Sequence, residues 1–342
     1  MNSATYEVSA LVTLTPREKE EFFPGALAEE MNELLPGAVW HDLPLGNGSD
    51  WLGLLQSTRP DILVGAWETP PLPLALMNGA GPMPSYFCYL CGSVRKYVPR
   101  EMIEDGLAVT NWGSVISDTV AECALLFILS CLRRSTYWNL AMHTGGAWKE
   151  GRHPDTQSLF GRRVGLHGLG AIGRDLVELL RPFKVPVTAY SPSVPDEMFR
   201  DLGVTRATSL ENLFEESDVL VELAPAKPEN RHLVNEDLLR RLPEGATFVN
   251  VGRGMVVDEE ALAKVALEGR LHLGLDVFQT EPLPKDSPLR GLPNVTLLPH
   301  LGGPTRDRRR ECGKLALRNV RRFLAGETLE NLITPDVYDR AT

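Results

Sequence analysis

A glycine pattern in the middle of the chain, Gly168-Leu169-Gly170-Ala171-Ile172-Gly173, constrains the fold more than any other feature. An apolar run over 164–167 precedes it, and a helix-like run over 174–180 follows it. Strand, glycine turn and helix in this order are typical of a dinucleotide site. The first glycine makes the tight turn, the second lets backbone approach a pyrophosphate, and the third lets the helix pack on the strand. We therefore expect a dinucleotide-binding domain around this turn, built after the first part of the chain has formed another unit.

Composition excludes several broad classes of protein. The chain has 342 residues, which is enough for two domains with separate cores. Its net charge of −10 argues against binding nucleic acid or an anionic membrane surface. No apolar run approaches the roughly 18 residues that a membrane span needs. The five cysteines are dispersed, and the lone Cys88-x-x-Cys91 pair has no second pair nearby, so we expect reduced thiols in a cytoplasmic protein and no metal site.

Short apolar runs alternate with helix-like segments along most of the chain. Before residue 110, runs at 8–12, 62–65 and 86–90 are typical of buried strands, with helices at 16–21 and 26–31. A long apolar helix is predicted from Ser117 to Arg134. From 163 onward, strands fit at 163–167, 185–190, 218–222, 246–250, 272–276 and 294–298. Helices fit at 171–182, 195–202, 209–215, 235–241 and 258–268, which predicts a parallel sheet, and a last helix fits at 305–325.

The residue that would contact the adenosine ribose is unusual. In NAD sites an acidic residue about 20 positions after the glycines binds the ribose hydroxyls. Here the second strand of the domain ends at Ser191. A serine can hydrogen-bond a ribose hydroxyl, but unlike a carboxylate it does not repel a 2′-phosphate. Residues 192–195 bring no cation, and Arg200 is the nearest one downstream. Both NAD and NADP therefore remain open as cofactors, and we favour NAD.

Three charged or titratable residues each follow the end of a predicted strand. Arg253 follows the strand at 246–250, Glu281 follows 272–276, and His300 follows 294–298. The carboxyl ends of parallel strands open into one crevice, so residues far apart in sequence can converge there. Taken singly, each is as easily a turn or loop residue with no chemical role. Together, they predict one site.

These residue types suit hydride transfer to a carbonyl carbon. The carbonyl oxygen gains alkoxide character, and a histidinium such as His300 can protonate it. A carboxylate beside the ring orients it and raises its pKa, which is the task expected of Glu281. Arg253 offers a flat, bidentate grip on a substrate carboxylate.

These motifs, in this order and spacing, resemble those of the D-isomer-specific 2-hydroxyacid dehydrogenases over nearly the whole chain. The residues that carry the resemblance are Val120-Ala121-Glu122, the turn at 168–173, Asn250-Val251-Gly252-Arg253-Gly254 with Val257-Asp258, Leu275-Asp276-Val277 with Glu281-Pro282, and Pro299-His300.

The resemblance implies roles for particular residues. It makes Arg253 the substrate-binding arginine, Glu281 the paired acid and His300 the catalytic acid/base. It implies a backbone loop at 92–94 for the substrate carboxylate. The implied cofactor contacts, beyond Gly168, Gly170, Gly173 and Ser191, are Ala171, Ile172, Ala224, Val251, Gly252 and Asp276. The implied substrate-binding residues are Gly92, Ser93, Val94 and Arg95.

Two positions leave alternatives open. Arg95 stands where the family often has an aspartate. It is either a surface arginine or, if it points inward, a sign of a dicarboxylic or phosphorylated substrate. His167, directly before the glycine turn, is expected to be a core histidine bonded to backbone.

We expect two doubly wound α/β domains, a Rossmann-type cofactor domain at 115–306 and a discontinuous flavodoxin-like substrate domain at 1–114 plus 307–342. The resemblance implies a homodimer through the cofactor domains, and the apolar helix at 120–132 fits such an interface. The expected activity is hydride transfer between NAD(P)H and a 2-keto acid or D-2-hydroxy acid. Two alternatives use the same residues: an NAD(H)-sensing corepressor-like scaffold, and a dehydrogenase of a non-carbon donor such as phosphite.

Overall fold

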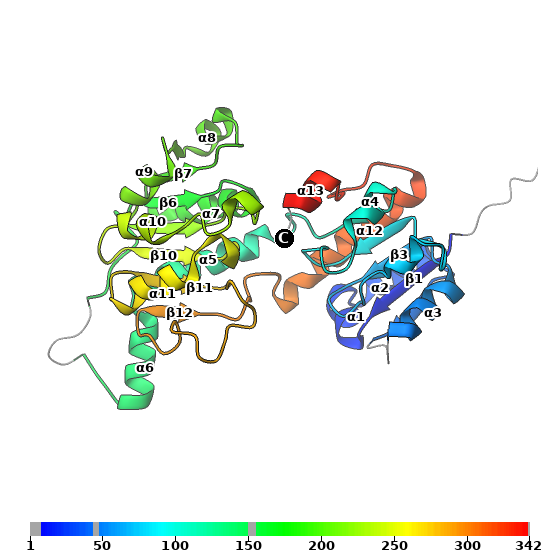
Figure 1. The fold of residues 1–342 in the computed structure, drawn as a ribbon, viewed down its shortest axis with the longest axis horizontal. Coiled ribbons are helices and arrows are strands. Elements are labelled where there is room, and N and C mark those ends of the chain that lie inside the picture. Colours follow the sequence, from blue (N-terminus) through cyan, green and yellow to red (C-terminus); the bar gives the residue numbers. More distant parts are fainter. Residues whose placement is uncertain (1–7, 44–47, 150–154, 341–342) are drawn as a thin grey trace, which may run out of the picture. The chain divides into compact units, whose positions relative to one another are not determined.

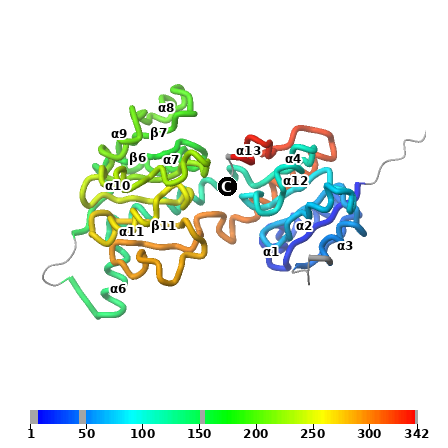
Figure 2. Tube along the Cα trace, in the orientation of Figure 1, coloured from blue at the N-terminus to red at the C-terminus, as the bar shows by residue number. Residues whose placement is uncertain are grey.

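The computed structural model describes residues 8–43, 48–149 and 155–340, which divide into two compact units (Figure 1). Unit 1 takes the chain up to Ile116 and again from Thr305, and unit 2 takes Ser117–Pro304. The chain therefore starts unit 1, builds unit 2 and returns to complete unit 1. Figure 2 shows this return, with the first and last parts of the trace in the same unit.

Unit 1 is built on a parallel sheet with the strand order β2-β1-β3-β4-β5. Three of these strands are buried along their whole length, because their sequences are continuous apolar runs rather than alternating ones. The strands are β1 (Ala10–Leu14), β2 (Val39–Asp42), β3 (Ile62–Gly65), β4 (Tyr86–Tyr89) and β5 (Ala108–Thr110). The helices are α1 (Pro16–Phe22), α2 (Ala26–Leu34), α3 (Gly48–Thr58), η1 (Leu74–Leu76), α4 (Arg100–Glu104), η5 (Arg306–Arg308), α12 (Arg309–Ala325) and α13 (Pro335–Arg340).

Helix α12 ties the end of the chain to the first helices of unit 1. It packs against α1, α2 and β4. Phe323 of α12 stacks on Tyr86 of β4 with ring centroids 4.9 Å apart. The closest approach is at Gly313, where a Cβ atom would lie 1.9 Å from the carbonyl oxygen of Phe22. Only glycine lets the two helices come this near.

Unit 2 is built on a larger parallel sheet with the order β12-β11-β10-β9-β6-β7-β8. The order reverses direction at β6, so β6 is the strand from which the two halves of the sheet diverge. The strands are β6 (Val164–His167), β7 (Val187–Tyr190), β8 (Thr205–Arg206), β9 (Val219–Glu222), β10 (Thr247–Asn250), β11 (His272–Leu275) and β12 (Val295–Leu297). The helices are α5 (Ser117–Leu132), α6 (Ser135–Gly145), α7 (Ala171–Leu180), η2 (Arg181–Phe183), α8 (Asp196–Leu202), α9 (Leu210–Glu215), η3 (Pro228–Asn230), α10 (Glu236–Arg241), η4 (Gly254–Val256) and α11 (Glu259–Leu267).

Helix α5 packs on β10, β11 and β12, and α7 packs against α5. Phe127 of α5 is fully buried, and a Cβ on Gly274 of β11 would lie 2.6 Å from it. The apolar stretch of α5 is thus buried mainly within unit 2. Helix α6 differs, because no side chain on it is buried, and Leu140 and Met142 are 43% and 46% exposed.

The predicted fold class, α/β with two parallel sheets, is confirmed. The strands and helices predicted from 163 onward are present with ends shifted by a few residues. The strands and α-helices that were not predicted from sequence are β2, β5, β8, α3, α4, α6 and α13. Within the described ranges, none of the helices has the length and hydropathy to cross a membrane.

Gly313→Ala tests the contact between α12 and α1. Alanine inside a helix normally stabilises it by about 1 kcal/mol relative to glycine. Here the methyl group would meet backbone, so we expect a net loss of about 1–3 kcal/mol in the free energy of unfolding, measured by urea denaturation. Gly145→Ala is the control, because the methyl group that it adds at the end of α6 would have nothing within 4 Å of it. Equal stability of the two variants would contradict the packing argument.

Candidate active site

The glycine turn has the geometry that a pyrophosphate needs. Gly168 has φ +111°, and a Cβ there would lie 2.8 Å from the carbonyl oxygen of Leu223. A Cβ on Gly173 would lie 2.8 Å from the carbonyl oxygen of Gly168. Gly170, by contrast, has nothing within 4 Å of the corresponding position, so its backbone is open to a ligand. The first and third glycines are required by the protein's own packing, and the second leaves room for a dinucleotide.

Helix α7 begins directly after Gly170, which is its N-cap residue. The N–H groups of the first turn have no partners within the helix and are available to phosphate oxygens. Ala171 and Ile172 of that turn are partly exposed, whereas Gly173 is buried. These residues fit the pyrophosphate of a dinucleotide, which they would hold by backbone rather than by side chains.

The other predicted cofactor residues of unit 2 lie at the carboxyl ends of β9 and β10. Ala224 and Val251 are 4% and 3% exposed. A Cβ on Gly252 would lie 2.9 Å from the carbonyl oxygen of Glu222, so the loops after the two strands touch through backbone. The Gly252 N–H donates to Asn250 Oδ1 at 3.1 Å, which fixes the start of the loop that carries Arg253.

The end of β7 brings a cation that the sequence analysis did not identify. Ser191 is partly exposed at this point, and Arg206 of β8 donates to its carbonyl oxygen at 3.4 Å and to that of Val194. The Arg206 guanidinium also lies 4.0 Å above the ring of Phe199 and 2.7 Å from the carboxylate of Asp196. Arg200, the cation named from sequence, lies exposed on α8.

The structure brings Glu281 and His300 into direct contact. His300 Nδ1 lies 2.7 Å from Glu281 Oε2, and Glu281 Oε1 accepts the N–H of Phe278 at 3.0 Å. Both side chains are accessible, with 51% of His300 and 36% of Glu281 exposed. One ring nitrogen of His300 is therefore engaged by the acid, and the other is left for a reacting group.

Arg253 completes the electrostatics of this edge. Arg253 Nη1 donates to the carbonyl oxygen of the preceding residue, Gly252, at 2.6 Å. Its positive charge acts to lower the pKa of Glu281 and also that of His300. All three residues predicted from sequence thus belong to one electrostatic group in unit 2.

Asp276 holds the loop that carries His300. It is 1% exposed, and its two carboxylate oxygens accept the N–H groups of Leu301 and Gly302 at 2.7 and 2.8 Å. Its own carbonyl oxygen accepts the His300 N–H at 2.9 Å. His300 adopts φ +56°, a left-handed conformation that is uncommon for a residue with a side chain. These three hydrogen bonds keep His300 in that conformation.

The pairing with Glu281 shifts the acid–base equilibria of both groups. The hydrogen bond to Glu281 is the largest cause that raises the pKa of His300 above its ordinary value, and burial opposes it. Burial acts to raise the pKa of Glu281, but the hydrogen bonds from His300 and Phe278 outweigh it and hold that pKa low. His300 therefore keeps its proton to a higher pH than an ordinary histidine does.

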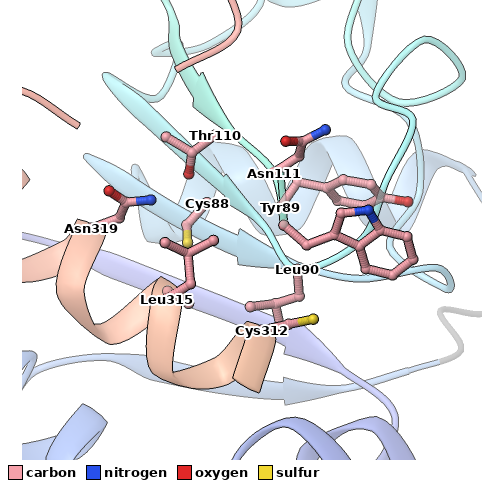
Figure 3. A pocket seen from close by; sticks show the side chains of 10 residues that line it. Cys88, Tyr89, Leu90, Thr110, Asn111, Cys312, Leu315 and Asn319 are labelled. Carbon is pink, nitrogen blue, oxygen red and sulfur yellow. The ribbon is translucent and has the colours of Figure 1, made fainter. Parts of the chain in front are cut away.

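In unit 1, the loop at 92–94 rests on the residues that follow β5. Asn111 Nδ2 donates to the Gly92 carbonyl oxygen at 2.6 Å, and a Cβ on Gly92 would lie 2.8 Å from the Trp112 ring. Asn111 and Trp112 also line a small pocket between β4, β5 and α12, whose walls include Cys88, Thr110 and Leu315 (Figure 3). Ser93 is partly exposed, whereas Val94 is buried.

Arg95 is bound within unit 1. Its side chain is exposed, and its guanidinium donates to the carbonyl oxygens of Tyr338 and Asp339 at the end of the chain. It also lies 5.8 Å from the centre of the Tyr338 ring. The alternative of a surface arginine describes this arrangement better than that of a residue pointing toward a substrate.

Comparison with known proteins places these motifs in a family. The family model for the D-isomer specific 2-hydroxyacid dehydrogenase, NAD binding domain, matches residues 125–302. The chain belongs to the D-isomer specific 2-hydroxyacid dehydrogenase family. A glyoxylate reductase of Korarchaeum cryptofilum is 33% identical over 242 residues, 70% of this chain and 72% of the relative. A hydroxyphenylpyruvate reductase of Plectranthus scutellarioides is 37% identical over 236 residues, 68% of this chain and 72% of the relative.

A solved structure shows the same likeness over the whole fold. The NADPH-dependent glyoxylate/hydroxypyruvate reductase of Sinorhizobium meliloti, in complex with NADP and malonate, has a TM-score of 0.73 and 25% identity, covering 98% of each chain. The resemblance inferred from sequence is therefore confirmed, as is the expected class of activity: this protein is an NAD(P)-dependent D-2-hydroxyacid dehydrogenase.

One prediction about the site region needs correction. His167 is a buried histidine, as expected, but its partner is a side chain rather than backbone: His167 Nδ1 lies 2.6 Å from Glu222 Oε2. No local signal in the sequence joins these residues, which are 55 positions apart. The same is true of Arg206 and Ser191, whose contact depends on the two-residue strand β8 pairing with β7.

Glu281→Gln is expected to lower the pKa of His300, because the carboxylate is the largest cause of its upward shift. The measurement is an NMR titration of the His300 ring, assigned with a His300→Gln sample. In the wild type the midpoint lies above the ordinary value of about 6.5, and in the variant it moves down. Glu229→Gln, which removes an exposed acid paired with Lys227, should leave the midpoint in place. An unmoved midpoint in Glu281→Gln would contradict the pairing.

Proposed function

We propose that this dehydrogenase reduces a small 2-keto acid. His300 is the proton donor, Glu281 is the carboxylate that orients the His300 ring and raises its pKa, and Arg253 is the residue that binds the substrate carboxylate. The observation that carries the proposal is the 2.7 Å contact between His300 and Glu281 beside Arg253, at the carboxyl edge of a sheet that also carries the glycine turn. Glyoxylate and hydroxypyruvate are the substrates we propose, because relatives of this chain are named for them.

Each residue has one task in the reduction. NAD(P)H bound at the glycine turn supplies the hydride. The Arg253 guanidinium offers parallel N–H donors to the two oxygens of the substrate carboxylate. In unit 1, the backbone at 92–94 stays a proposed contact for a substrate carboxylate. The free ring nitrogen of His300 donates a proton to the carbonyl oxygen as negative charge develops there, and the Glu281 carboxylate stabilises the imidazolium before transfer.

His300→Gln separates the proton step from cofactor binding. We expect kcat for glyoxylate reduction to fall by about 10²–10⁴, the usual contribution of a general acid. The Kd for NADH, measured by fluorescence titration, should stay within about twofold because the glycine turn is untouched. The assay follows cofactor absorbance with a panel of glyoxylate, hydroxypyruvate, pyruvate and phosphite. An equal loss of turnover and cofactor affinity would contradict the role of His300, and tight binding without turnover of any donor or acceptor would favour a sensor.

Reduction should also depend on pH in a definite direction. The protonated form of His300 is the acid, and its raised pKa extends that form above the ordinary range. The rate of keto-acid reduction therefore falls as pH rises through the raised pKa, whereas oxidation of the hydroxy acid rises through the same range. A wild-type reduction rate that stays flat from about pH 6 to 9 under single-turnover conditions would contradict this assignment.

For the cofactor, we propose that NADPH is accepted and preferred, which departs from the preference for NAD drawn from sequence alone. Ser191 brings no carboxylate to repel a 2′-phosphate, and the Arg206 guanidinium lies beside it. Asp196, the present partner of Arg206, is 74% exposed, so a phosphate can replace it at little cost. Charge-assisted hydrogen bonds from an arginine to phosphate are among the strongest available.

Arg206→Gln should weaken NADPH much more than NADH. Loss of a hydrogen bond to a charged group is worth about 1.5–3 kcal/mol, so we expect the Kd for NADPH to rise about 10–150-fold. Because Arg206 also bonds the backbone of the turn after β7, a small rise in the Kd for NADH is expected too, and the ratio of the two constants is the decisive readout. Arg200→Gln, at an exposed position of α8, is the matched control. An unchanged ratio in Arg206→Gln would leave NAD as the preferred cofactor.

We also propose that the protein is a homodimer through unit 2, and that it resides in the cytoplasm. The support for the dimer is the exposed apolar surface of α6, where Leu140 and Met142 lie, together with exposed Leu126 on α5. The dimer face proposed here thus centres on α6 rather than on the buried stretch of α5. The support for the cytoplasm is that all five cysteines are free thiols.

A further inference from the structure

A second histidine–glutamate pair lies buried at the base of the glycine turn. His167 is the last residue of β6 and Glu222 is the last residue of β9, and the parallel register sets them side by side. His167 Nδ1 lies 2.6 Å from Glu222 Oε2, with 6% and 0% of the two side chains exposed. The reaction proposed above uses neither residue. A buried carboxyl group and a buried imidazole are both costly in a core, which makes their presence here significant.

The pair joins the two backbone segments that surround the turn. Gly168 follows His167 directly, and the His167 carbonyl oxygen accepts the Leu223 N–H at 2.9 Å. Glu222 Oε1 accepts the Ala224 N–H at 2.7 Å, so its carboxyl group ties the loop at 223–226 to β6 through His167. The same loop meets Gly168 through the Leu223 carbonyl oxygen. Movement of the pair would therefore move the turn and the loop together.

Proton counting gives the pair two charge states. A contact of 2.6 Å between Nδ1 and a carboxyl oxygen requires one proton between them. With that proton alone, the pair carries a net charge of −1. A second proton, on Nε2, makes the ring an imidazolium and brings the net charge to zero. The pyrophosphate of a dinucleotide brings two further negative charges to the adjacent turn, and it is repelled only by the first state.

We propose that His167 and Glu222 form a proton-linked positioning pair for the dinucleotide, in which the neutral, doubly protonated state favours binding at the Gly168–Gly173 turn. Cofactor binding then takes up a proton, and the affinity for a dinucleotide falls as pH rises. The proposal depends on cofactor binding at this turn, and it is independent of the substrate and of the role given to His300.

The groups that face His167 support this assignment. On β7 the facing residue is Tyr190, in register with His167 and with its ring centroid 6.1 Å away. On β9 it is Glu222, and among the described residues Glu222 is the one whose charge contributes to the shift. Burial lowers the pKa of His167, but the charge and hydrogen bond of Glu222 outweigh it and raise the pKa above its ordinary value. Arg206, the nearest cation described on β8, is engaged by Asp196 and the turn after β7.

Glu222→Gln is the variant that isolates the charge. The amide oxygen can still accept the Ala224 N–H, and the amide nitrogen can donate to Nδ1 of a neutral His167, so both hydrogen bonds are kept without the titrating pair. The probe is ADP-ribose, which carries the pyrophosphate, lacks the nicotinamide that would approach His300, and has no phosphate that titrates between pH 6 and 9. Its Kd is measured by calorimetry across that range, in two buffers of different ionisation enthalpy.

We expect the wild-type Kd for ADP-ribose to rise about three- to tenfold between pH 6 and 9, with net proton uptake on binding. In Glu222→Gln the Kd should be flat and the proton uptake lost. His300→Gln is the matched control, since it removes the other paired histidine and should keep the wild-type profile. A slope that persists in Glu222→Gln, or that disappears in His300→Gln, would overturn the proposal. The wild-type protein alone also tests the proposal: if ADP-ribose binds with no proton uptake anywhere between pH 6 and 9, the pair is not proton-linked to binding.

Discussion

The parallel register of the larger sheet is the constraint on which the rest of unit 2 depends. Tyr190, His167, Glu222, Asn250 and Leu275 are successive register partners across β7, β6, β9, β10 and β11. Because these residues end their strands in one row, every following loop starts from the same edge of the sheet. The loops after β6 and β10 both meet the backbone at the end of β9, which is why glycine is required at Gly168 and at Gly252. A side chain at either glycine would push these loops apart and disrupt the surface on which a dinucleotide would bind.

Polar side chains at the strand ends then decide where the chemically active groups lie. Asn250 accepts the Gly252 N–H and donates to the Arg253 carbonyl oxygen, which folds the loop after β10. Asp276 performs the same task for the loop of His300, with both of its oxygens used by backbone N–H groups. The resemblance implied that Asp276 contacts the cofactor, and its observed bonds indicate a positioning role. Buried polar groups are tolerated at this edge because each of these has its partners.

Much of this architecture could be predicted from local patterns. The spacing of the glycines, together with the apolar run before them, was sufficient for β6, the turn and α7. The rule that functional residues follow parallel strands was sufficient to group Arg253, Glu281 and His300, although it says nothing of the contact between the last two. Other contacts have no local signature. Arg206 reaches Ser191 only because a strand of two residues pairs with β7, and Arg95 meets Tyr338 across 243 positions of sequence. Periodicity cannot detect so short a strand, and no spacing rule predicts a pairing of distant side chains.

The two histidine–glutamate pairs of unit 2 show how environment assigns different tasks to the same chemistry. In the pair of His300 and Glu281, half of the imidazole and about a third of the carboxylate are exposed, so protons can pass to a substrate or to water. In the pair of His167 and Glu222, the exposed fractions are 6% and 0%, and no substrate can reach the ring. Electrostatic fields act more strongly where water does not screen them. A buried pair is therefore suited to respond to the charge of a bound dinucleotide, whereas an accessible pair is suited to deliver a proton during the reaction that the dinucleotide drives.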